Sequence, residues 1–172
     1  MLIVGLGNPE EKYQNTRHNA GQMLADFLVN KWGLEWKKRK DLLCRLASKD
    51  DLYLAKPLTF MNESGQAVAK LVGKLKVGLN DLYIVHDELD LRLGEYKITL
   101  GKSSPLHKGV LSVEQHLKTK DFWRLRIGVD NRDPNNRIEG EKYVLQRFNG
   151  REKEILIGVL KKLADQIFGL AG

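Results

Sequence analysis

The chain has 172 residues, 42% of them hydrophobic, which is enough for one well-filled core. Its 29 lysine and arginine residues exceed its 22 aspartate and glutamate residues, and the formal charge of +7 favours a polyanionic partner such as nucleic acid. Without a run of about 18 apolar residues or a signal-peptide pattern, a membrane protein is not expected. We therefore expect a single domain over residues 1–172, soluble and cytoplasmic.

The chain opens with an apolar run, residues 2–4, that breaks into Gly5-Leu6-Gly7-Asn8-Pro9. Such a run closed by glycine and proline predicts a buried strand. The Gly-x-Gly pattern also raises dinucleotide binding, but the third glycine is missing and Pro9 stands where a helix should approach phosphate. We therefore disfavour a dinucleotide site.

Helical spacing of apolar residues predicts a helix over residues 20–32, capped by Asn15 or Thr16. Residues 42–47 and 52–55 flank a polar turn and predict a hairpin that ends at Pro57. A second apolar stripe predicts a helix over residues 67–75, with Asn62 or Ser64 as its cap.

The second half of the chain continues the alternation of strands and helices. We expect strands at residues 82–85, 96–100 and 122–129, a short helix at 110–117 and a closing amphipathic helix at 155–167. The first of these strands is expected to end at the acidic run 86–90. This order predicts an α/β fold, a single-domain three-layer sandwich with a twisted mixed β-sheet and helices on both faces.

Four polar residues, Asn8, His18, Asn62 and Asp87, each follow a predicted strand. If those strands are parallel neighbours, the four side chains meet at one rim of the sheet. Histidine is the natural general base near neutral pH, and a carboxylate on its second nitrogen fixes the tautomer. Asparagine amides can donate to an oxyanion or hold water through the amide oxygen. The pattern predicts hydrolysis by water that His18 activates and Asp87 supports.

Each residue also has a plain structural interpretation. His18 can simply begin a helix, Asn62 can cap one, and Asp87 can belong to a solvated acidic turn, for which a magnesium site ranks lower because no phosphate-cradling loop accompanies it. Cys44 is the only cysteine and has apolar neighbours, which indicates a buried structural thiol. The four histidines lack metal-ligand spacing, so we expect no metal and no cofactor.

Four spaced motifs resemble the bacterial-type peptidyl-tRNA hydrolases. They are residues 5–9 (GLGNP), 13–19 (Tyr-x-Asn-Thr-Arg-His-Asn), 56–65 (Lys-Pro-x-Thr-Phe-Met-Asn-x-Ser-Gly) and 86–90 (HDELD), with further matches at 124–128 and 143–148. The resemblance implies a monomeric enzyme that hydrolyses the ester between a peptide, or an N-blocked amino acid, and tRNA.

The same resemblance gives the residues roles. It makes His18 the base that activates water, Asp87 the group that stabilises its working form, and Asn8 the residue that distinguishes blocked from free aminoacyl ends. The expected contacts with the peptidyl-tRNA end are Tyr13, Phe60, Met61 and Asn62.

An RNA substrate would also account for the basic excess, because phosphate contacts supply affinity without reading sequence. The predicted phosphate contacts are Lys97, Lys102, Lys108, Arg124 and Arg126. The resemblance implies a lysine and arginine clamp on tRNA, in which Arg126 matches the arginine. The lysine position falls near Thr99, which leaves Lys97 or Lys102 as substitutes.

The chain departs from the family at residues 101–109, where Lys108 replaces an asparagine expected to hold substrate and water. Lysine has donors but no acceptor, so a water held through an amide oxygen would lose that partner. Two alternatives to the hydrolase remain open, and the Lys108 substitution favours the first of them. One is a catalytically impaired RNA-binding relative of the same fold, and the other is an unrelated small esterase that acts without RNA.

Overall fold

The computed structural model describes residues 1–101 and 106–171, and within them seven strands form one sheet in the order β2-β3-β4-β1-β5-β7-β6. The strands are β1 (Leu2–Gly5), β2 (Lys37–Arg39), β3 (Cys44–Lys49), β4 (Leu52–Pro57), β5 (Leu82–Arg92), β6 (Tyr96–Leu100) and β7 (Trp123–Asp130). β1 pairs in parallel with β4 and β5, and β5 pairs in parallel with β7. The remaining pairs are antiparallel, so the sheet is mixed, as predicted.

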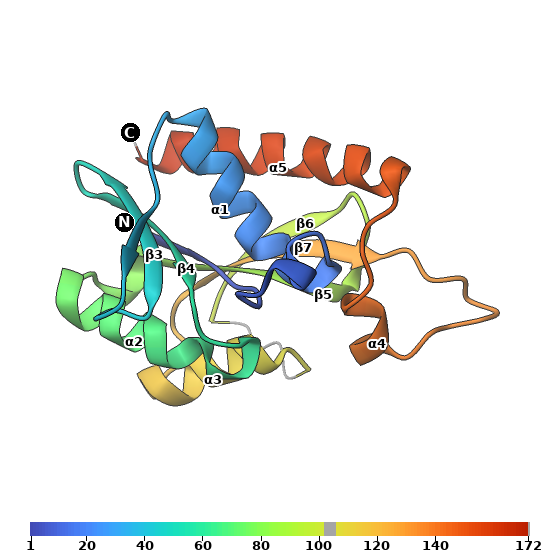
Figure 1. The fold of residues 1–172 in the computed structure, drawn as a ribbon, viewed down its shortest axis with the longest axis horizontal. Helices are drawn as coiled ribbons and strands as arrows, with labels where there is room; N and C mark the ends of the chain where they lie inside the picture. The colour runs from blue at the N-terminus through green and yellow to red at the C-terminus, as the bar shows by residue number, and fades with distance from the viewer. Residues whose placement is uncertain (102–105, 172) are drawn as a thin grey trace.

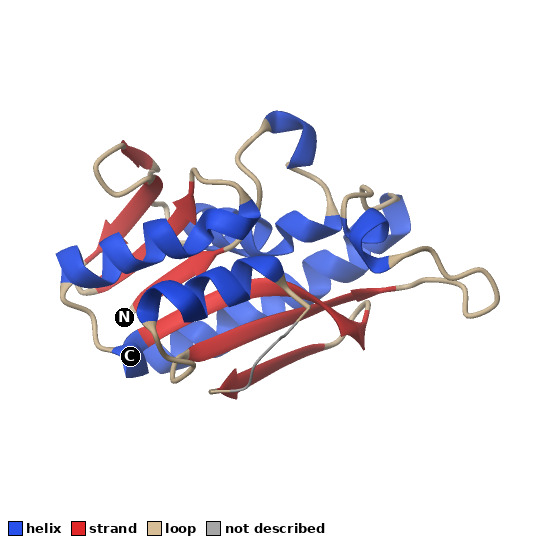
Figure 2. Cartoon of the chain, turned by 90° about the horizontal axis from the view of Figure 1, so that it is seen from below, coloured by secondary structure: helices blue, strands red, loops and turns tan. Residues whose placement is uncertain are grey.

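Helices cover both faces of the sheet. Helices α1 (Ala20–Lys31) and α5 (Gly150–Ala171) lie on one face, and α2 (Ser64–Leu75) and α3 (Lys108–Leu117) lie on the other (Figure 1). Seen from below, the strands lie behind α2 and α3 (Figure 2). Alternate residues of β1 enter different cores, with Ile3 packed on the α1 and α5 side and Val4 on the α2 and α3 side. The three-layer sandwich is confirmed.

Two glycines bring α1 against the sheet. A Cβ on Gly21 would collide with the Val85 carbonyl oxygen of β5, and a Cβ on Gly5 would collide with the Gly21 carbonyl oxygen. Only glycine permits so close an approach. The short 3-10 helix η2 (Arg17–Asn19), which leads directly into α1, is thereby held at the carboxyl end of β1 and beside the middle of β5.

The prediction that β5 ends before the acidic run was wrong, because the strand continues to Arg92. Beyond Val85, β5 has lost its neighbour β1, which ends at Gly5, but it stays paired with β7 through Glu88. The edge of β5 that faced β1 therefore has no strand paired with it beyond Val85. Asp87 lies within a strand and not after one, at the place where the sheet opens.

The predicted caps were also wrong. Both helices begin from short 3-10 turns, and neither Asn19, which precedes α1, nor Glu63, which precedes α2, makes a side-chain cap hydrogen bond. The expected cap Ser64 instead donates to the Met61 carbonyl oxygen. The short strand β2 and helix α4 (Gly140–Val144) were not predicted, because segments this short carry little periodicity.

Arg17, the neighbour of His18, ties η2 to the start of α5. Its Nη2 donates to both carboxylate oxygens of Glu152 at 2.8 Å, and both side chains are almost fully buried. Its Nη1 donates to the carbonyl oxygens of Gln146 and Arg147, and its guanidinium lies 4.1 Å from the Tyr143 ring centroid. The start of α5 and the residues just before it thus fix the position of η2, which carries His18.

We expect Arg17→Met to lower the free energy of unfolding by about 3–5 kcal/mol, because it leaves Glu152 charged and buried without its partner. Urea unfolding followed by circular dichroism measures the change. Arg151→Met, at an exposed position next to Glu152, is the matched control and should change stability little. A loss below about 1 kcal/mol for Arg17→Met would show that Glu152 keeps other compensation.

Cys44 is fully buried, and burial raises the pKa of its thiol to about 11. A thiol this far from its thiolate form is a poor nucleophile, which agrees with the prediction of a buried structural thiol.

None of the helices in the described part of the chain is long and apolar enough to span a lipid bilayer.

Candidate active site

The four predicted catalytic residues meet in one pocket of about 380 Å³, lined by segments that follow β1 and β4 and by the second half of β5. Its walls come from segments far apart in the sequence. They are Asn8, Tyr13, His18, Phe60, Met61, Asn62, Asp87, Glu88, Leu89, Asp90, Leu106, His107, Lys108, Gly140, Glu141, Val144 and Leu145. Of the predicted substrate contacts, Tyr13, Phe60, Met61, Asn62 and Lys108 line the pocket, whereas Lys97 and Arg126 do not.

His18 and Asp87 form a direct pair in this pocket. The His18 Nδ1 lies 3.0 Å from the Asp87 Oδ1 and 3.2 Å from its Oδ2. Because a carboxylate only accepts hydrogen bonds, Nδ1 carries the proton and Nε2 is the basic nitrogen. This arrangement suits a histidine base, because the hydrogen bond from Nδ1 to Asp87 fixes the tautomer and leaves Nε2 to accept a proton.

The pair shifts both pKa values. Burial alone lowers the pKa of His18, but the charge and hydrogen bond of Asp87 outweigh burial and raise that pKa above the ordinary 6.5. Burial alone raises the pKa of Asp87, but the charges of His18 and His107 hold it well below its ordinary range. Asp87 is therefore ionised wherever His18 titrates.

A second imidazole, that of His107, shares the Asp87 carboxylate. Its Nε2 donates to Asp87 Oδ1 at 2.9 Å, and its Nδ1 accepts the Val110 N–H at 3.2 Å and so caps α3. Sequence reasoning did not assign His107 a role. The available signal was its position three residues before the predicted helix 110–117, where an imidazole nitrogen can cap the backbone.

His86 lies behind this pair and is fully buried. Its Nδ1 donates to the Asp87 carbonyl oxygen at 2.7 Å, and its ring contacts His107 with the centroids 4.7 Å apart. Burial first, and then the charge of His107, lower the pKa of His86 to about 3. His86 is thus a neutral packing group at the pH where His18 works.

Three hydrogen bonds to described residues hold Asn8 and leave the nitrogen of its side-chain amide without a partner among them. Its backbone N–H and C=O pair with the Asn19 side chain, each at 2.9 Å, and its Oδ1 accepts the Met61 N–H at 2.9 Å. The Nδ2 donor is therefore the group that Asn8 can offer to a ligand. The position of Asn19 in the Asn8 network was not foreseen.

Asn62 and several exposed apolar residues line the pocket. Asn62 is exposed, and its side chain has no hydrogen bond with any described residue. Phe60 is 44% exposed, Leu106 is 87% exposed and Leu145 is 47% exposed. These exposed apolar side chains gather around a polar centre, as in sites that bind organic ligands.

Lys108 reaches over the pocket to Glu141. Its Nζ lies 2.8 Å from Glu141 Oε1, and both side chains are mostly exposed. The ion pair joins the start of α3 to the start of α4 across the pocket wall. The Lys108 charge also opposes protonation of His18.

The other predicted phosphate contacts are in different environments. Arg124 is fully buried, ion-paired with Glu114 and stacked on Phe122, so the prediction that it contacts phosphate was wrong. Arg126 is 6% exposed and pairs with Glu88 at 2.9 Å. Lys97 is exposed on the edge strand β6, opposite Arg126 in the register. Lys102 lies outside the described residues.

The described residues also contain one group with potential metal ligands. His18, Asp87 and His107 offer ligand atoms that all lie within 4.8 Å of one another. Both ring nitrogens in this group already hydrogen-bond to Asp87. A metal ion would have to replace those bonds, so the donor set fits a proton-transfer network better than a metal site.

The histidine–carboxylate pocket in this three-layer α/β fold fits the class of enzymes that use a histidine general base. The comparisons give the family: residues 2–171 match the peptidyl-tRNA hydrolase family. Named peptidyl-tRNA hydrolases from Akkermansia muciniphila (38% identity, 96% of this chain and 86% of the relative) and Mycoplasmopsis synoviae (41%, 95% and 86%) are similar. A crystal structure of peptidyl-tRNA hydrolase from Acinetobacter baumannii is similar with a TM-score of 0.88 at 29% identity, over 96% of this chain and 85% of that chain. The chain belongs to the peptidyl-tRNA hydrolase family.

Proposed function

We propose that this chain hydrolyses the ester between a peptide, or an N-blocked amino acid, and tRNA, by attack of a water molecule that His18 activates. The family to which the chain belongs supports the reaction and the substrate. The single observation that carries the mechanism is the His18–Asp87 pair in a pocket that also contains Asn8 and Asn62.

The reaction begins with a proton transfer from water to the His18 Nε2. The hydroxide equivalent adds to the ester carbonyl carbon, and the carbonyl oxygen becomes an oxyanion. When the intermediate collapses, the bond to the ribose oxygen breaks, and the His18 imidazolium returns its proton to that oxygen. The products are the free peptide acid and tRNA, and the histidine ends neutral.

Asp87 stabilises the positive charge that His18 carries between these two proton transfers. Its second partner, His107, donates to the same oxygen and fixes the position of the carboxylate. His107 is thus proposed as a positioning residue. No proton needs to pass from His18 to Asp87, because the carboxylate pKa is far below that of the imidazole.

The two asparagines divide the remaining work. Since Asn8 Oδ1 already accepts the Met61 N–H, Asn8 donates through Nδ2, which suits the oxyanion or the blocked amide of the substrate. Asn62 has both ends of its amide available and can accept from the attacking water. Tyr13, Phe60 and Met61 supply the surrounding contacts with the peptidyl-tRNA end.

The tRNA phosphates are proposed to contact Lys97 and Lys108, which are exposed. Arg126 lies beside Lys97 in the sheet, and its contact with phosphate requires the Arg126–Glu88 pair to open. Lys102 is proposed from the sequence alone. We also propose that the protein acts as a monomer in the cytoplasm, where tRNA is found.

The test is release of an N-blocked amino acid from charged tRNA by the purified protein at two salt concentrations. The same blocked amino acid, esterified to a simple alcohol, is the matched control without RNA. A hydrolase acts on the tRNA ester and loses affinity as salt rises. Tight tRNA binding without release would indicate a catalytically impaired RNA-binding protein, an alternative that the family match does not support. Equal cleavage of both esters would indicate a simple esterase.

We expect Lys108→Ala to raise the KM for N-blocked aminoacyl-tRNA several-fold and to reduce the salt slope of binding by about one phosphate contact. Glu141→Gln should act in the opposite direction, because it frees the Lys108 ammonium from its counter-ion. Steady-state kinetics across a salt series measure both effects. If neither variant changes the slope, Lys108 makes no phosphate contact.

A further inference from the structure

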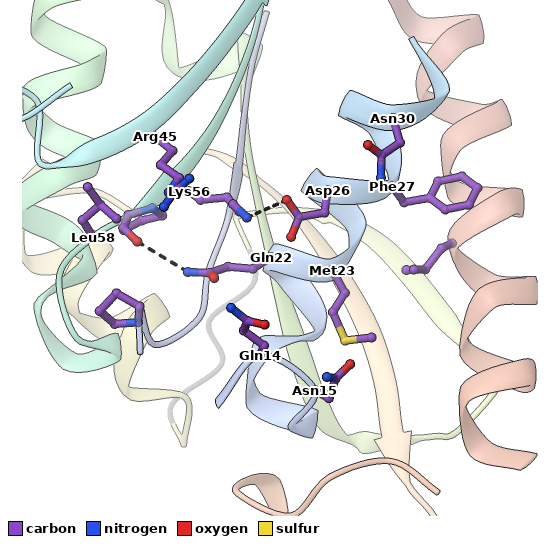
Figure 3. Close-up of a pocket in the computed structure, with 13 residues that line it drawn as sticks. Gln14, Asn15, Gln22, Met23, Asp26, Phe27, Asn30, Arg45, Lys56 and Leu58 are labelled. Carbon is purple, nitrogen blue, oxygen red and sulfur yellow. Dashed lines mark hydrogen bonds and ion pairs between the residues drawn. The ribbon is translucent and has the colours of Figure 1, made fainter. Parts of the chain in front are cut away.

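A second cleft lies on the other side of residues 9–15 from the catalytic pocket. It measures about 510 Å³, against about 380 Å³ for the catalytic pocket. Its walls are α1, the hairpin β3–β4 and the loop after β1, and Leu160 of α5 completes the lining (Figure 3). This volume is within the range of about 300–1,000 Å³ that is typical of ligand sites. Nothing in the mechanism above uses it.

The polar lining of this cleft is dominated by neutral amides. Gln14, Asn15 and Asn30 line it from two walls, and their side chains form no hydrogen bond with any described residue (Figure 3). Each such amide offers both donors and an acceptor. A peptide main chain presents the complementary groups, one N–H and one C=O per residue, whatever its side chains are. The lining therefore suits a peptide of any sequence.

The charge of the cleft argues against RNA as its occupant. Arg45 and Lys56 stand opposite each other in the β3–β4 register. Lys56, however, is paired with Asp26 at 2.5 Å, so its charge is already compensated (Figure 3). Its ammonium group also lies over the Trp36 ring. A single-stranded RNA groove needs a row of available cations and exposed aromatic faces. Arg45 alone does not provide one.

The two pockets share one thin wall. Asn8 and Tyr13 line the catalytic pocket, while their chain neighbours Pro9 and Gln14 line the second cleft. Gln22 fixes this wall, because its Nε2 donates to the Gly7 carbonyl oxygen at 3.0 Å and to the Pro57 carbonyl oxygen at 3.4 Å. A peptide longer than a few residues must leave the catalytic pocket, and the chain neighbours of two residues that line this pocket line the second cleft.

We propose that this cleft binds the main chain of the peptide, several residues upstream of the ester, and so favours long peptidyl-tRNAs over N-blocked aminoacyl-tRNAs. The proposal rests on the proposed hydrolase function. It adds a part of the substrate that neither the catalytic residues nor the RNA contacts recognise. The amides provide affinity without sequence preference.

The test compares two substrates, N-acetyl-aminoacyl-tRNA and the same tRNA carrying a peptide of several residues. Gln14→Ala and Asn30→Ala remove one amide each, and Asn30→Trp fills the cleft from an exposed position on α1. We expect each alanine variant to raise the KM for the long substrate by about two- to tenfold, the value of one lost hydrogen bond, and to leave the short substrate unchanged. Glu11→Ala, exposed on the same loop but outside both pockets, is the matched control.

The short substrate also reports folding, since a misfolded variant would lose both activities. Equal effects on both substrates, or no effect on either, would overturn the proposal. A loss of affinity for uncharged tRNA would assign the cleft to RNA instead. The comparison is repeated as equilibrium binding in a His18→Ala background, where the substrates stay intact. A length preference seen there supports the peptide cleft even if the wild-type protein proves not to be a hydrolase.

Discussion

His18→Ala is expected to lower kcat for N-blocked aminoacyl-tRNA by about 10²–10⁴-fold, while the affinity for tRNA stays nearly unchanged. The factor is the usual contribution of a general base. Affinity is preserved because the proposed phosphate contacts, Lys97 and Lys108, lie outside the His18–Asp87 pair. Single-turnover release of the blocked amino acid and a separate tRNA-binding titration measure the two quantities.

His116→Ala is the matched control, because His116 is exposed on α3, does not line the pocket and, among the described residues, hydrogen-bonds to the backbone of its own helix alone. It should keep full activity. A His18→Ala protein that retained more than about a tenth of the wild-type rate would exclude His18 as the base.

Asp87→Asn is expected to lower kcat by about 10³–10⁴-fold, because an amide cannot accept from two imidazole N–H groups in the same way as a carboxylate. In the folded protein Asp87 accepts from both His18 and His107. With asparagine there, at least one of the two rings has to change its tautomer or lose its partner.

The pH profile adds a signed prediction to the same variant. A base works in its neutral form, so wild-type activity falls as pH drops through the raised pKa of His18. Without the Asp87 charge that pKa falls, and the acidic limb of the profile moves to lower pH. Asp81→Asn, the same change at the exposed residue that precedes β5, should leave the limb in place. An Asp87→Asn profile that keeps the wild-type limb would show that another group titrates.

The spacing of apolar residues correctly predicted the longer helices and most of the strands. The helices α1, α2, α3 and α5 and the strands β1, β3, β4, β6 and β7 occur where the apolar spacing placed them, to within a few residues. The resemblance to the family also named His18, Asp87, Asn8 and Asn62, which all line one pocket. The prediction failed at β5, where pairing with β7 extended a strand through polar residues that sequence rules assign to a turn.

The charge of a residue alone predicted the phosphate contacts less well, because its ion-pair partners in the folded protein were not known. Arg124 and Arg126 look like surface cations in the sequence, because arginine is rarely buried. In the structure Glu114 and Glu88 compensate them inside the protein. Which cations face solvent depends on pairs between residues that are distant in the chain, and no local pattern contains that information.

The sequence by itself determined the alternation of strands and helices, the excess of basic residues and the residue types of a hydrolytic centre. These properties depend on side-chain chemistry and short-range spacing. Only the tertiary structure decided that His107 shares Asp87 with His18 and that the Asn8 amide oxygen is already occupied. It also created the second cleft between α1 and the β3–β4 hairpin. The physical reason is that these contacts join segments brought together by strand order and by the glycine contact of α1, which follow from packing of the whole chain.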